Sequence, residues 1–255
     1  MRIVLLGAGN VATHLSFALQ QAGHSIMQIY SRSEDSAAAL ASALNTCWTT
    51  EIKCLSAVAD LYFFSLKDDA LPAAVSQLAP NNGIWVHTSG SIPMSIFNNY
   101  ANRYGVVYPL QTFSKARKTD FSQAPCFVEA NCKSTETVLY ETAGQLSKQV
   151  YLLNSERRKY LHLAAVFACN FTNHMYVLAG RILEKEAIPM AVLFPLIDET
   201  AAKIHTLSPD EAQTGPAVRY DQSVIEKHLN LLSTSEMREI YQLISKNIHK
   251  ESVHE

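Results

Sequence analysis

Ile3-Val4-Leu5-Leu6-Gly7-Ala8-Gly9-Asn10-Val11-Ala12 decides the fold of this chain. A short apolar run that ends in Gly-x-Gly-x-x-Ala and continues as a helix is typical of the first strand, turn and helix of a dinucleotide-binding domain. Gly7 permits the tight turn, Gly9 lets the backbone approach a pyrophosphate, and Ala12 keeps the helix close to the strand. The free N–H groups at the start of the helix then attract the phosphates. A plain strand-turn-helix packing unit is the alternative.

The residues that follow the turn favour the dinucleotide site. Gly23 ends the helix before a second apolar strand, Ser25 to Tyr30. Between the two glycine-containing turns, apolar residues recur at helical spacing. These residues are Val11, Leu15, Ala18, Leu19 and Ala22.

Ser31-Arg32-Ser33, at the end of the second strand, favours NADP over NAD. A site for NAD usually carries Asp or Glu there, because the carboxylate accepts a hydrogen bond from the ribose 2′-hydroxyl. Two hydroxyls and a guanidinium instead suit a 2′-phosphate, since Arg supplies paired donors and a permanent charge. The alternative is that Ser33 caps the next helix, and both roles are compatible.

The composition is that of a globular, enzyme-sized chain. Its 255 residues, 48% of them hydrophobic and 17% charged, suffice for one large or two ordinary domains. A net charge of −2 without a dense basic stripe argues against nucleic acid as a partner. Five cysteines without a C-x-x-C spacing favour reduced thiols in the cytoplasm over a disulfide framework or a metal cluster.

Two apolar stretches resemble membrane segments but do not fit one. Ile3 to Leu6 is too short for a signal peptide and is followed by glycines. Tyr160 to Gly180 contains no Asp, Glu, Lys or Arg and is long enough to span a bilayer. It nevertheless carries His, Asn and Thr residues that hydrocarbon would not solvate. We therefore expect a soluble protein with a buried helix and no membrane partner.

Strands and helices alternate in the first part of the chain, whereas only helices are expected after Asn154. Strands joined by helices on short connections predict a doubly wound, mostly parallel Rossmann-like α/β sheet over residues 1–153. Residues 154–255 are expected to form an all-α substrate and dimerisation domain. Further expectations are a helix from about Ile52 to Ala59, a helix cap by Asp68 or Asp69, a long helix from about Glu156 to Glu186 and another around Val192 to Leu207.

Three further loops should lie at the carboxyl ends of the strands, where ligands collect in such sheets. Ser65 to Asp69 would line the path of the ribose and nicotinamide. His87 to Ser91 is small and polar enough to approach the nicotinamide, although an ordinary turn explains it equally well. Tyr108 to Phe113 could close a substrate pocket, or its aromatic side chains could belong to the core.

One face of the long helix is unusually polar. His162, Asn170 and Asn173 lie at spacings of three and four on an otherwise apolar stripe with Val166 and Val177. Such groups either bond to neighbouring helices or face a cleft.

Arg219 and Asp221 follow the Gly215-Pro216 bend in the second domain. Arg219 could hold a substrate carboxylate, pair with Asp221 or cap a helix.

Several of these segments together resemble a bacterial family of NADP-dependent oxidoreductases, in which a Rossmann-like domain precedes a helical domain of unknown function. More distantly the chain is similar to pyrroline-5-carboxylate reductase, ketopantoate reductase and the 6-phosphogluconate and β-hydroxyacid dehydrogenases. This similarity implies a helical second domain of the 6-phosphogluconate dehydrogenase type, which often dimerises. The segments are Gly7–Ala12, Ser65–Ala70, His87–Gly90, Tyr108–Phe113, Tyr160–Asn170 and the Thr214-Gly215-Pro216 tract.

The chain departs from the related families at two positions. The hydroxyacid dehydrogenases carry a catalytic Lys one turn before an Asn on their long helix, but Val166 to Cys169 precede Asn170 here. In the family that the chain resembles, the Thr-Gly-Pro tract usually continues Arg-Gly-Asp, whereas Tyr220 replaces that glycine. A bulky residue there would narrow the pocket or change the local backbone.

These observations predict an NADP(H)-dependent oxidoreductase that transfers hydride to or from a small carbonyl, imine or alcohol. His162 is the candidate proton donor, Asn170 would orient the substrate and Arg219 would anchor an anion. The alternative is a non-catalytic NADP sensor or interaction protein, and a homodimer through the helical domain is expected in either case. The residues expected to bind the cofactor are Gly7, Gly9, Asn10, Val11, Ala12, Ser31, Arg32, Ser33, Ser65, Leu66, Thr88 and Ser89.

Overall fold

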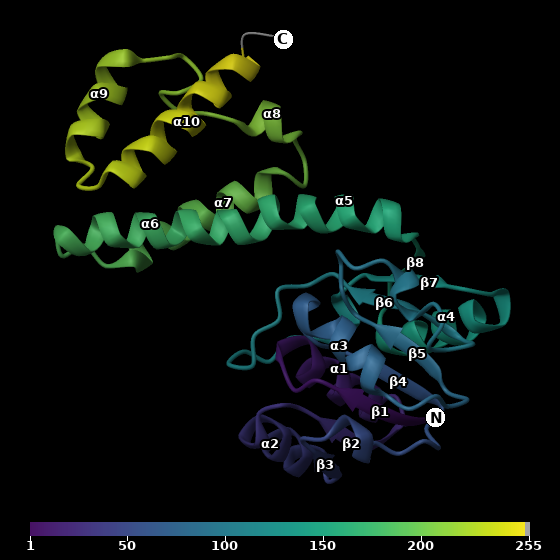
Figure 1. Cartoon of the computed structure of the whole chain (residues 1–255). Helices are drawn as coiled ribbons and strands as arrows, with labels where there is room; N and C mark the ends of the chain where they lie inside the picture. Colours follow the sequence, from purple (N-terminus) through teal and green to yellow (C-terminus); the bar gives the residue numbers. More distant parts are fainter. Residues whose placement is uncertain (253–255) are drawn as a thin grey trace. The chain divides into compact units, whose positions relative to one another are not determined.

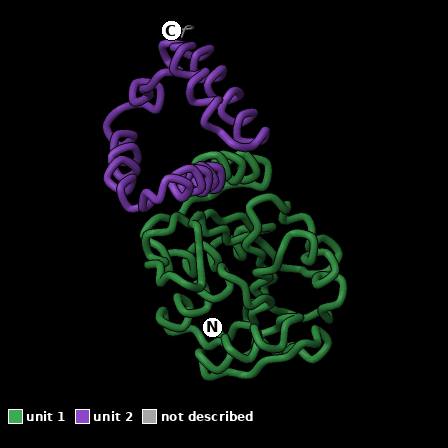
Figure 2. Tube along the Cα trace, turned by 90° about the vertical axis from the view of Figure 1, so that its left-hand side faces the viewer, with its two compact units in different colours: residues 1–169 green, residues 170–255 purple. Residues whose placement is uncertain are grey.

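The computed structural model describes residues 1–252 and divides the chain into two compact units. The first unit is Met1–Cys169 and the second is Asn170–Glu255 (Figures 1 and 2). The expected domain limit at 153/154 lies where the last strand gives way to helix, at the cap residue Asn154. The division into units falls later because the first turns of that helix bond to the sheet.

An eight-stranded sheet forms the centre of the first unit, in the order β3-β2-β1-β4-β5-β6-β7-β8. All neighbouring strands are parallel except β6 and β7, so the expected mostly parallel, Rossmann-like sheet is confirmed. The strands are β1 (Arg2–Leu6), β2 (Ser25–Tyr30), β3 (Cys47–Thr49), β4 (Leu61–Phe64), β5 (Ile84–His87), β6 (Tyr104–Pro109), β7 (Cys126–Ala130) and β8 (Val150–Leu152).

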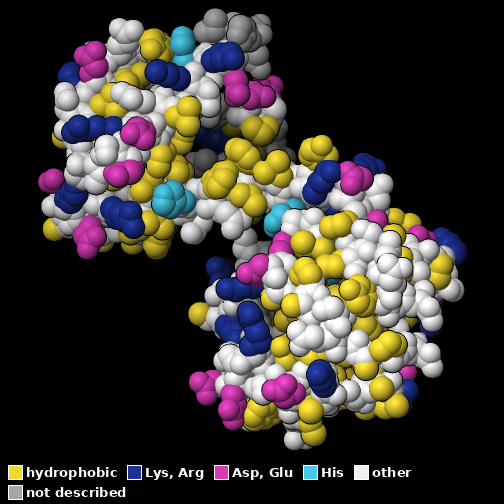
Figure 3. Space-filling view, in the orientation of Figure 1, with side chains coloured by type: hydrophobic (Ala, Val, Ile, Leu, Met, Phe, Trp, Pro, Cys, Tyr) yellow, Lys and Arg dark blue, Asp and Glu magenta, His cyan; other side chains and the backbone are white. Residues whose placement is uncertain are grey.

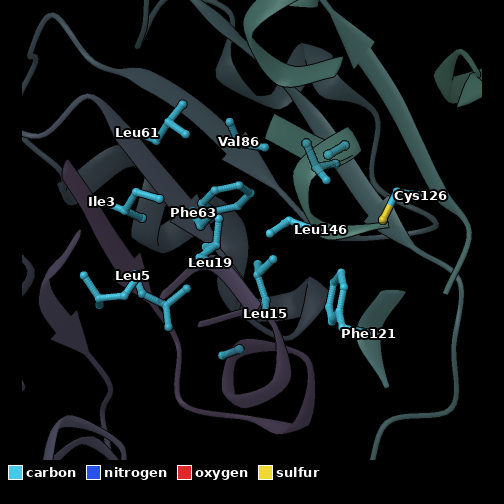
Figure 4. Close-up of a cluster of buried hydrophobic side chains, with 14 of the residues drawn as sticks. Ile3, Leu5, Leu15, Leu19, Leu61, Phe63, Val86, Phe121, Cys126 and Leu146 are labelled. Carbon is cyan, nitrogen blue, oxygen red and sulfur yellow. The ribbon is translucent and has the colours of Figure 1, made fainter. Parts of the chain in front are cut away.

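Helices cover both faces of this sheet, because its buried strands alternate apolar side chains between two separate cores. Ile3, Leu5 and Phe63 belong to the core that Figure 4 shows. Val4 and Phe64 belong to the core on the other face. The first core contains α1 (Asn10–Gln21), α2 (Glu34–Leu44) and α4 (Lys133–Leu146), and the second contains α3 (Leu71–Gln77) with the short 3-10 turns η1 (Ile52–Cys54) and η3 (Met94–Phe97).

Two local expectations in this unit were wrong. The helix expected over Ile52 to Ala59 is only the three-residue turn η1, because Leu55 is already extended and a one-turn helix has no repeat to propagate. Neither Asp68 nor Asp69 caps α3; both lie in the 3-10 turn η2 (Asp68–Ala70), and the Asp68 carboxylate accepts a hydrogen bond from the Ser91 hydroxyl.

The long helix expected from Glu156 is present but contains a change of register. It consists of α5 (Ser155–Ala165), a π-helical turn η5 (Val166–Phe171) and α6 (Thr172–Lys185). A π-helical turn has a wider repeat than an α-helix. The spacing argument that placed His162 and Asn170 on one stripe therefore fails across this turn.

The second unit is helical throughout its described residues, as expected. After α6 it contains the 3-10 turn η6 (Met190–Leu193), α7 (Phe194–Lys203), α8 (Pro209–Ala212), α9 (Gln222–Leu231) and α10 (Ser235–Ser252). The helix expected around Val192 to Leu207 is therefore α7 preceded by a 3-10 turn. No helix within residues 1–252 is both long enough and apolar enough to cross a membrane.

The expectation that Tyr160 to Gly180 forms a buried helix is wrong for the single chain. Tyr160 and Phe167 are 68% and 63% exposed, and Leu163 and Phe171 are also exposed. The helices of one chain are too few to cover every apolar side of this segment, which leaves large apolar side chains on its surface.

Candidate functional site

The first half of the candidate site lies where the strand order reverses. Strand β1 pairs with β2 on one side and with β4 on the other, and ligands of doubly wound sheets bind at the carboxyl ends of such strands. Gly7 has a φ of +122°, and a Cβ added to it would lie 2.1 Å from the carbonyl oxygen of Ser65. Gly7 therefore serves both the turn and the contact between the ends of β1 and β4.

Gly9 has a different role, because the fold does not need a glycine there. Its φ is ordinary, and a Cβ added to it would meet no atom within 4 Å. The α1 helix that follows has no side-chain cap and no acidic residue in its first turn. The open space beside Gly9 and the uncapped N–H groups fit a pyrophosphate, which a side chain at Gly9 would obstruct.

At the end of β2 the structure separates the roles of three neighbouring residues. The Ser33 hydroxyl caps α2 by accepting from the Ser36 N–H, so the capping alternative is correct for Ser33. The Ser31 hydroxyl accepts from the Ser33 N–H. Arg32 is exposed, and within residues 1–252 its guanidinium has no hydrogen-bond or ion-pair partner. Arg32 is thus the group left free for a 2′-phosphate.

Small polar residues follow β4 and β5. The Thr88 hydroxyl donates to the Ser65 hydroxyl at 3.2 Å, which joins the ends of the two strands. The Ser89 hydroxyl accepts from the N–H groups of Ser91 and Ile92, so this residue forms an ordinary turn. Leu66 is half-buried and packs against the second core.

The second half of the site is formed by α5 against the ends of β5 and β6. Nδ1 of His162 lies 2.9 Å from the hydroxyl oxygen of Tyr108, the penultimate residue of β6. The rings meet edge to face, and a Cβ added to Gly90 would lie 2.6 Å from the imidazole. The imidazole is therefore wedged between Tyr108 and the backbone of Gly90.

Tyr108 engages one ring nitrogen of His162 and leaves the other available. Burial raises the pKa of the Tyr108 phenol to about 12, so the phenol keeps its proton at neutral pH. The phenol can donate to Nδ1 or accept from Nδ1–H, so this ring nitrogen is engaged in either case. Nε2 is the ring nitrogen that Tyr108 leaves available for a ligand.

Arg158 fixes this part of α5 to the sheet. The guanidinium is 1% exposed and donates to the Glu129 carboxylate at 2.6 Å and to the Ile92 carbonyl at 2.6 Å. Since Arg158 and His162 are four residues apart, they lie on the same side of the helix.

Sequence reasoning missed the contribution of Arg158 and Glu129 to this site, and it gave Tyr108 only within a segment that could close a pocket or belong to the core. The available signal was the i, i+4 spacing of Arg158 and His162, which places both on one side of the helix.

Asn170 and Arg219 belong to the second unit, whereas His162 belongs to the first. Asn170 is exposed within the π-helical turn. Arg219 is exposed without an ion pair among the described residues, and Asp221 instead caps α9 by accepting from the Val224 N–H.

Tyr220 has a φ of +50°, a conformation that suits glycine, and stacks on His249. That conformation costs a non-glycine residue about 1–2 kcal/mol, so Tyr220 keeps the backbone shape at the expense of some strain.

The sheet order, the glycine turn and the uncapped helix define the first unit as a dinucleotide-binding domain. Comparisons with known proteins agree. Residues 2–88 match the family described as "NADP oxidoreductase coenzyme F420-dependent", and residues 124–248 match the domain of unknown function DUF2520. No curated protein was found to match the chain.

Solved structures identify the family. A protein described as "putative NADP oxidoreductase BF3122 from Bacteroides fragilis" is 48% identical over 98% of both chains, with a TM-score of 0.92. The chain belongs to this family of NADP oxidoreductases with a DUF2520 domain, which confirms the predicted family and NADP as its cofactor.

More distant structures share the fold. Pyrroline-5-carboxylate reductase from Streptococcus pyogenes is 12% identical over 98% of both chains, with a TM-score of 0.64. An imine reductase from Myxococcus stipitatus in complex with NADP+ is 14% identical over 100% of this chain and 93% of that one, with a TM-score of 0.65.

Proposed function

We propose that this protein is an NADPH-dependent reductase of a small carbonyl or imine, with His162 as its proton donor. The observation that carries the proposal is the placement of the His162 imidazole between Tyr108 and Gly90, at the carboxyl ends of β5 and β6. Bound NADPH supplies the hydride. An imine substrate class is supported by the shared fold of the imine reductase.

Different residues of the first unit bind the cofactor and donate the proton. The Gly7 turn and the uncapped N-terminus of α1 hold the pyrophosphate, with Asn10, Val11 and Ala12 supplying backbone N–H groups. Arg32 and the Ser31 hydroxyl hold the 2′-phosphate. The proton that reduction requires comes from Nε2–H of the His162 imidazolium, whose Nδ1–H donates to the Tyr108 hydroxyl oxygen. The neutral imidazole that remains then takes up a proton from water. The hydrogen-bonded hydroxyls of Ser65 and Thr88 provide polar groups at the ends of β4 and β5, between the two halves of the site.

Asn170 and Arg219 are the proposed substrate-binding residues of the second unit. Both are exposed polar groups, and Arg219 has no ion-pair partner among the described residues. We propose that Asn170 orients the reacting group and that Arg219 holds a substrate anion. The alternative of a non-catalytic NADP sensor gains no support from the related structures.

We further propose a homodimer in the cytoplasm. The exposed apolar side chains of α5 and α6 give a surface that a second copy would cover, since two-fold dimers are the commonest assembly. The five cysteines are free thiols, which suits a reducing compartment. Light scattering at micromolar concentration should give twice the chain mass, and a monomer mass would contradict the dimer.

Substitution of His162 tests the proposed chemistry. NADPH consumption is followed with a panel of small ketones, aldehydes and cyclic imines, and NADPH affinity is measured separately by fluorescence. His162→Ala should lower kcat by about 10²–10⁴-fold and leave NADPH affinity nearly unchanged. Tyr108→Phe should shift the pH dependence of kcat, because Nδ1 of the imidazole loses its hydrogen-bond partner.

His174→Ala is the matched control, since His174 is an exposed histidine of α6. It should retain full activity. If His162→Ala turns over every reducible substrate at the rate of the unmodified protein, His162 is not the proton donor. Loss of thermal stability without a specific loss of kcat would identify it as a structural residue.

A further inference from the structure

A basic turn between β6 and β7 lies against the first turns of α1. Residues Ser114 to Arg117 form a tight turn that is closed by a hydrogen bond from the Arg117 N–H to the Ser114 carbonyl at 3.2 Å. The same two residues form an isolated antiparallel bridge. The turn is thus an ordered feature that follows the Tyr108–Phe113 segment.

Three contacts hold this basic turn beside the glycine-rich turn. Nε2 of His14 donates to the Ser114 carbonyl at 2.9 Å, and the Lys115 N–H donates to Oδ1 of Asn10 at 3.3 Å. Phe113 stacks on His14 with ring centroids 5.0 Å apart. Because Asn10 is the first residue of α1, these contacts place Lys115 next to the helix N-terminus.

The charge of this region is unbalanced. Lys115, Arg117 and Lys118 lie within four residues, all are exposed, and none has an ion-pair partner among residues 1–252. The first turn of α1 adds no acidic residue and contributes the positive end of its dipole. Figure 3 shows Lys and Arg side chains gathered on one side of the first unit. Such a concentration of one sign attracts an anion.

We propose that the basic turn 114–118 is a second wall of the cofactor site, in which Lys115 and Arg117 bind the pyrophosphate. Nothing in the glycine-rich motif itself supplies a charged side chain for those phosphates, since Gly7 to Ala12 contains none. The basic turn supplies it from more than one hundred residues along the chain, through the contact of Lys115 with Asn10, for which the separation is 105 residues. The inference rests on the proposed NADPH binding and adds a division of labour to it: Arg32 for the 2′-phosphate, the basic turn for the pyrophosphate.

Ligands that carry only one of the two phosphate groups test this division. NADPH carries both groups, NADH and ADP-ribose carry only the pyrophosphate, and adenosine 2′-monophosphate carries only the 2′-phosphate. Dissociation constants are measured by calorimetry with the full chain, so no catalytic activity is needed. Lys115→Ala/Arg117→Ala is the test variant, and Lys53→Ala/Lys133→Ala removes two exposed cations elsewhere as the matched control.

The test variant should bind NADPH, NADH and ADP-ribose each roughly a hundredfold or more weakly, because it loses two charge-assisted contacts that are each worth about 1.5–3 kcal/mol. Its affinity for adenosine 2′-monophosphate should stay within about twofold of the unmodified protein, as should all affinities of the control variant. Unchanged affinity for ADP-ribose in the test variant would overturn the inference, as would a loss confined to NADPH. Failure of the unmodified protein to bind NADPH would instead overturn the proposed function.

Discussion

The two halves of the candidate site differ in how completely their polar groups are already bonded. At the ends of β1 and β2, Arg32 has no partner within the described residues, and Gly9 borders open space. At the ends of β5 and β6, His162 is already bonded to Tyr108 and packed on Gly90. The first half therefore leaves its binding groups available for a ligand, whereas the second half holds its reactive group in position beforehand, which lowers the cost of orientation.

We expect the largest effect from Gly90→Ala, which should displace the imidazole in the second half of the site and lower kcat. The new methyl group would lie 2.6 Å from Cγ and Nδ1 of His162, which is closer than real contacts allow. The imidazole must move, and its hydrogen bond to Tyr108 is lost. We expect kcat to fall by roughly 10²-fold or more, the range of general acid catalysis, while NADPH affinity stays nearly constant.

Gly144→Ala is the control for that variant, because a Cβ there meets no atom within 4 Å. Stopped-flow measurement of NADPH oxidation and equilibrium titration of NADPH separate the two readouts. Equal losses of NADPH affinity and kcat in Gly90→Ala would show that the two halves are not independent.

We expect an intermediate effect from Arg32→Ala, which should weaken NADPH binding in the first half of the site. Loss of a charge-assisted contact costs about 1.5–3 kcal/mol, so NADPH should bind roughly tenfold or more weakly while NADH binding is unchanged. At saturating NADPH, kcat should not change, because Arg32 does not contact His162. Titration of both cofactors against the variant checks this result, with Lys53→Ala as a control. If the unmodified protein binds NADH as tightly as NADPH, Arg32 has no role in cofactor choice.

The first half could be read from the sequence because its signals are local. The residues from Gly7 to Ala12 and from Ser31 to Ser33 lie within short turns next to their own strands, and turn geometry follows from residue type. The competing role of Ser33 as a helix cap was also predicted from its residue type, because serine is a preferred N-cap residue. The mostly parallel pairing of the strands likewise follows from alternating strands and helices.

The second half depends on long-range contacts that no local pattern encodes. Tyr108 and His162 are 54 residues apart, and Arg158 reaches Ile92 across 66. The periodicity of the long helix placed His162 and Asn170 on one face, which does not hold because the π-helical turn η5 changes the register from Val166 onward. An amphipathic pattern assumes one uniform repeat.

The smallest expected effect concerns His87, which lies in the second half of the site. Its buried imidazole should make the folding stability of the protein depend on pH. His87 is the last residue of β5, fully buried, and burial together with nearby Arg158 lowers its pKa to about 3. In the unfolded chain a histidine binds a proton below about pH 6.5, so between that pH and about 3 the unfolded state binds more protons than the folded state. Stability is therefore fully present well above pH 6.5 and is lost as the pH falls, by about 1 kcal/mol between pH 6.5 and 5.5.

Denaturant unfolding at pH 6.5 and 5.5 measures this loss. His87→Gln should lower stability at both pH values but remove most of the difference between them, because glutamine does not titrate. His24→Gln is the control for a partly buried histidine in the same unit, whose pKa is also lowered by burial. If His87→Gln retains the full pH dependence, the buried imidazole is not its source. The second half of the site would then be no more sensitive to acid than the first half. The two halves would differ only in ligand binding and proton transfer.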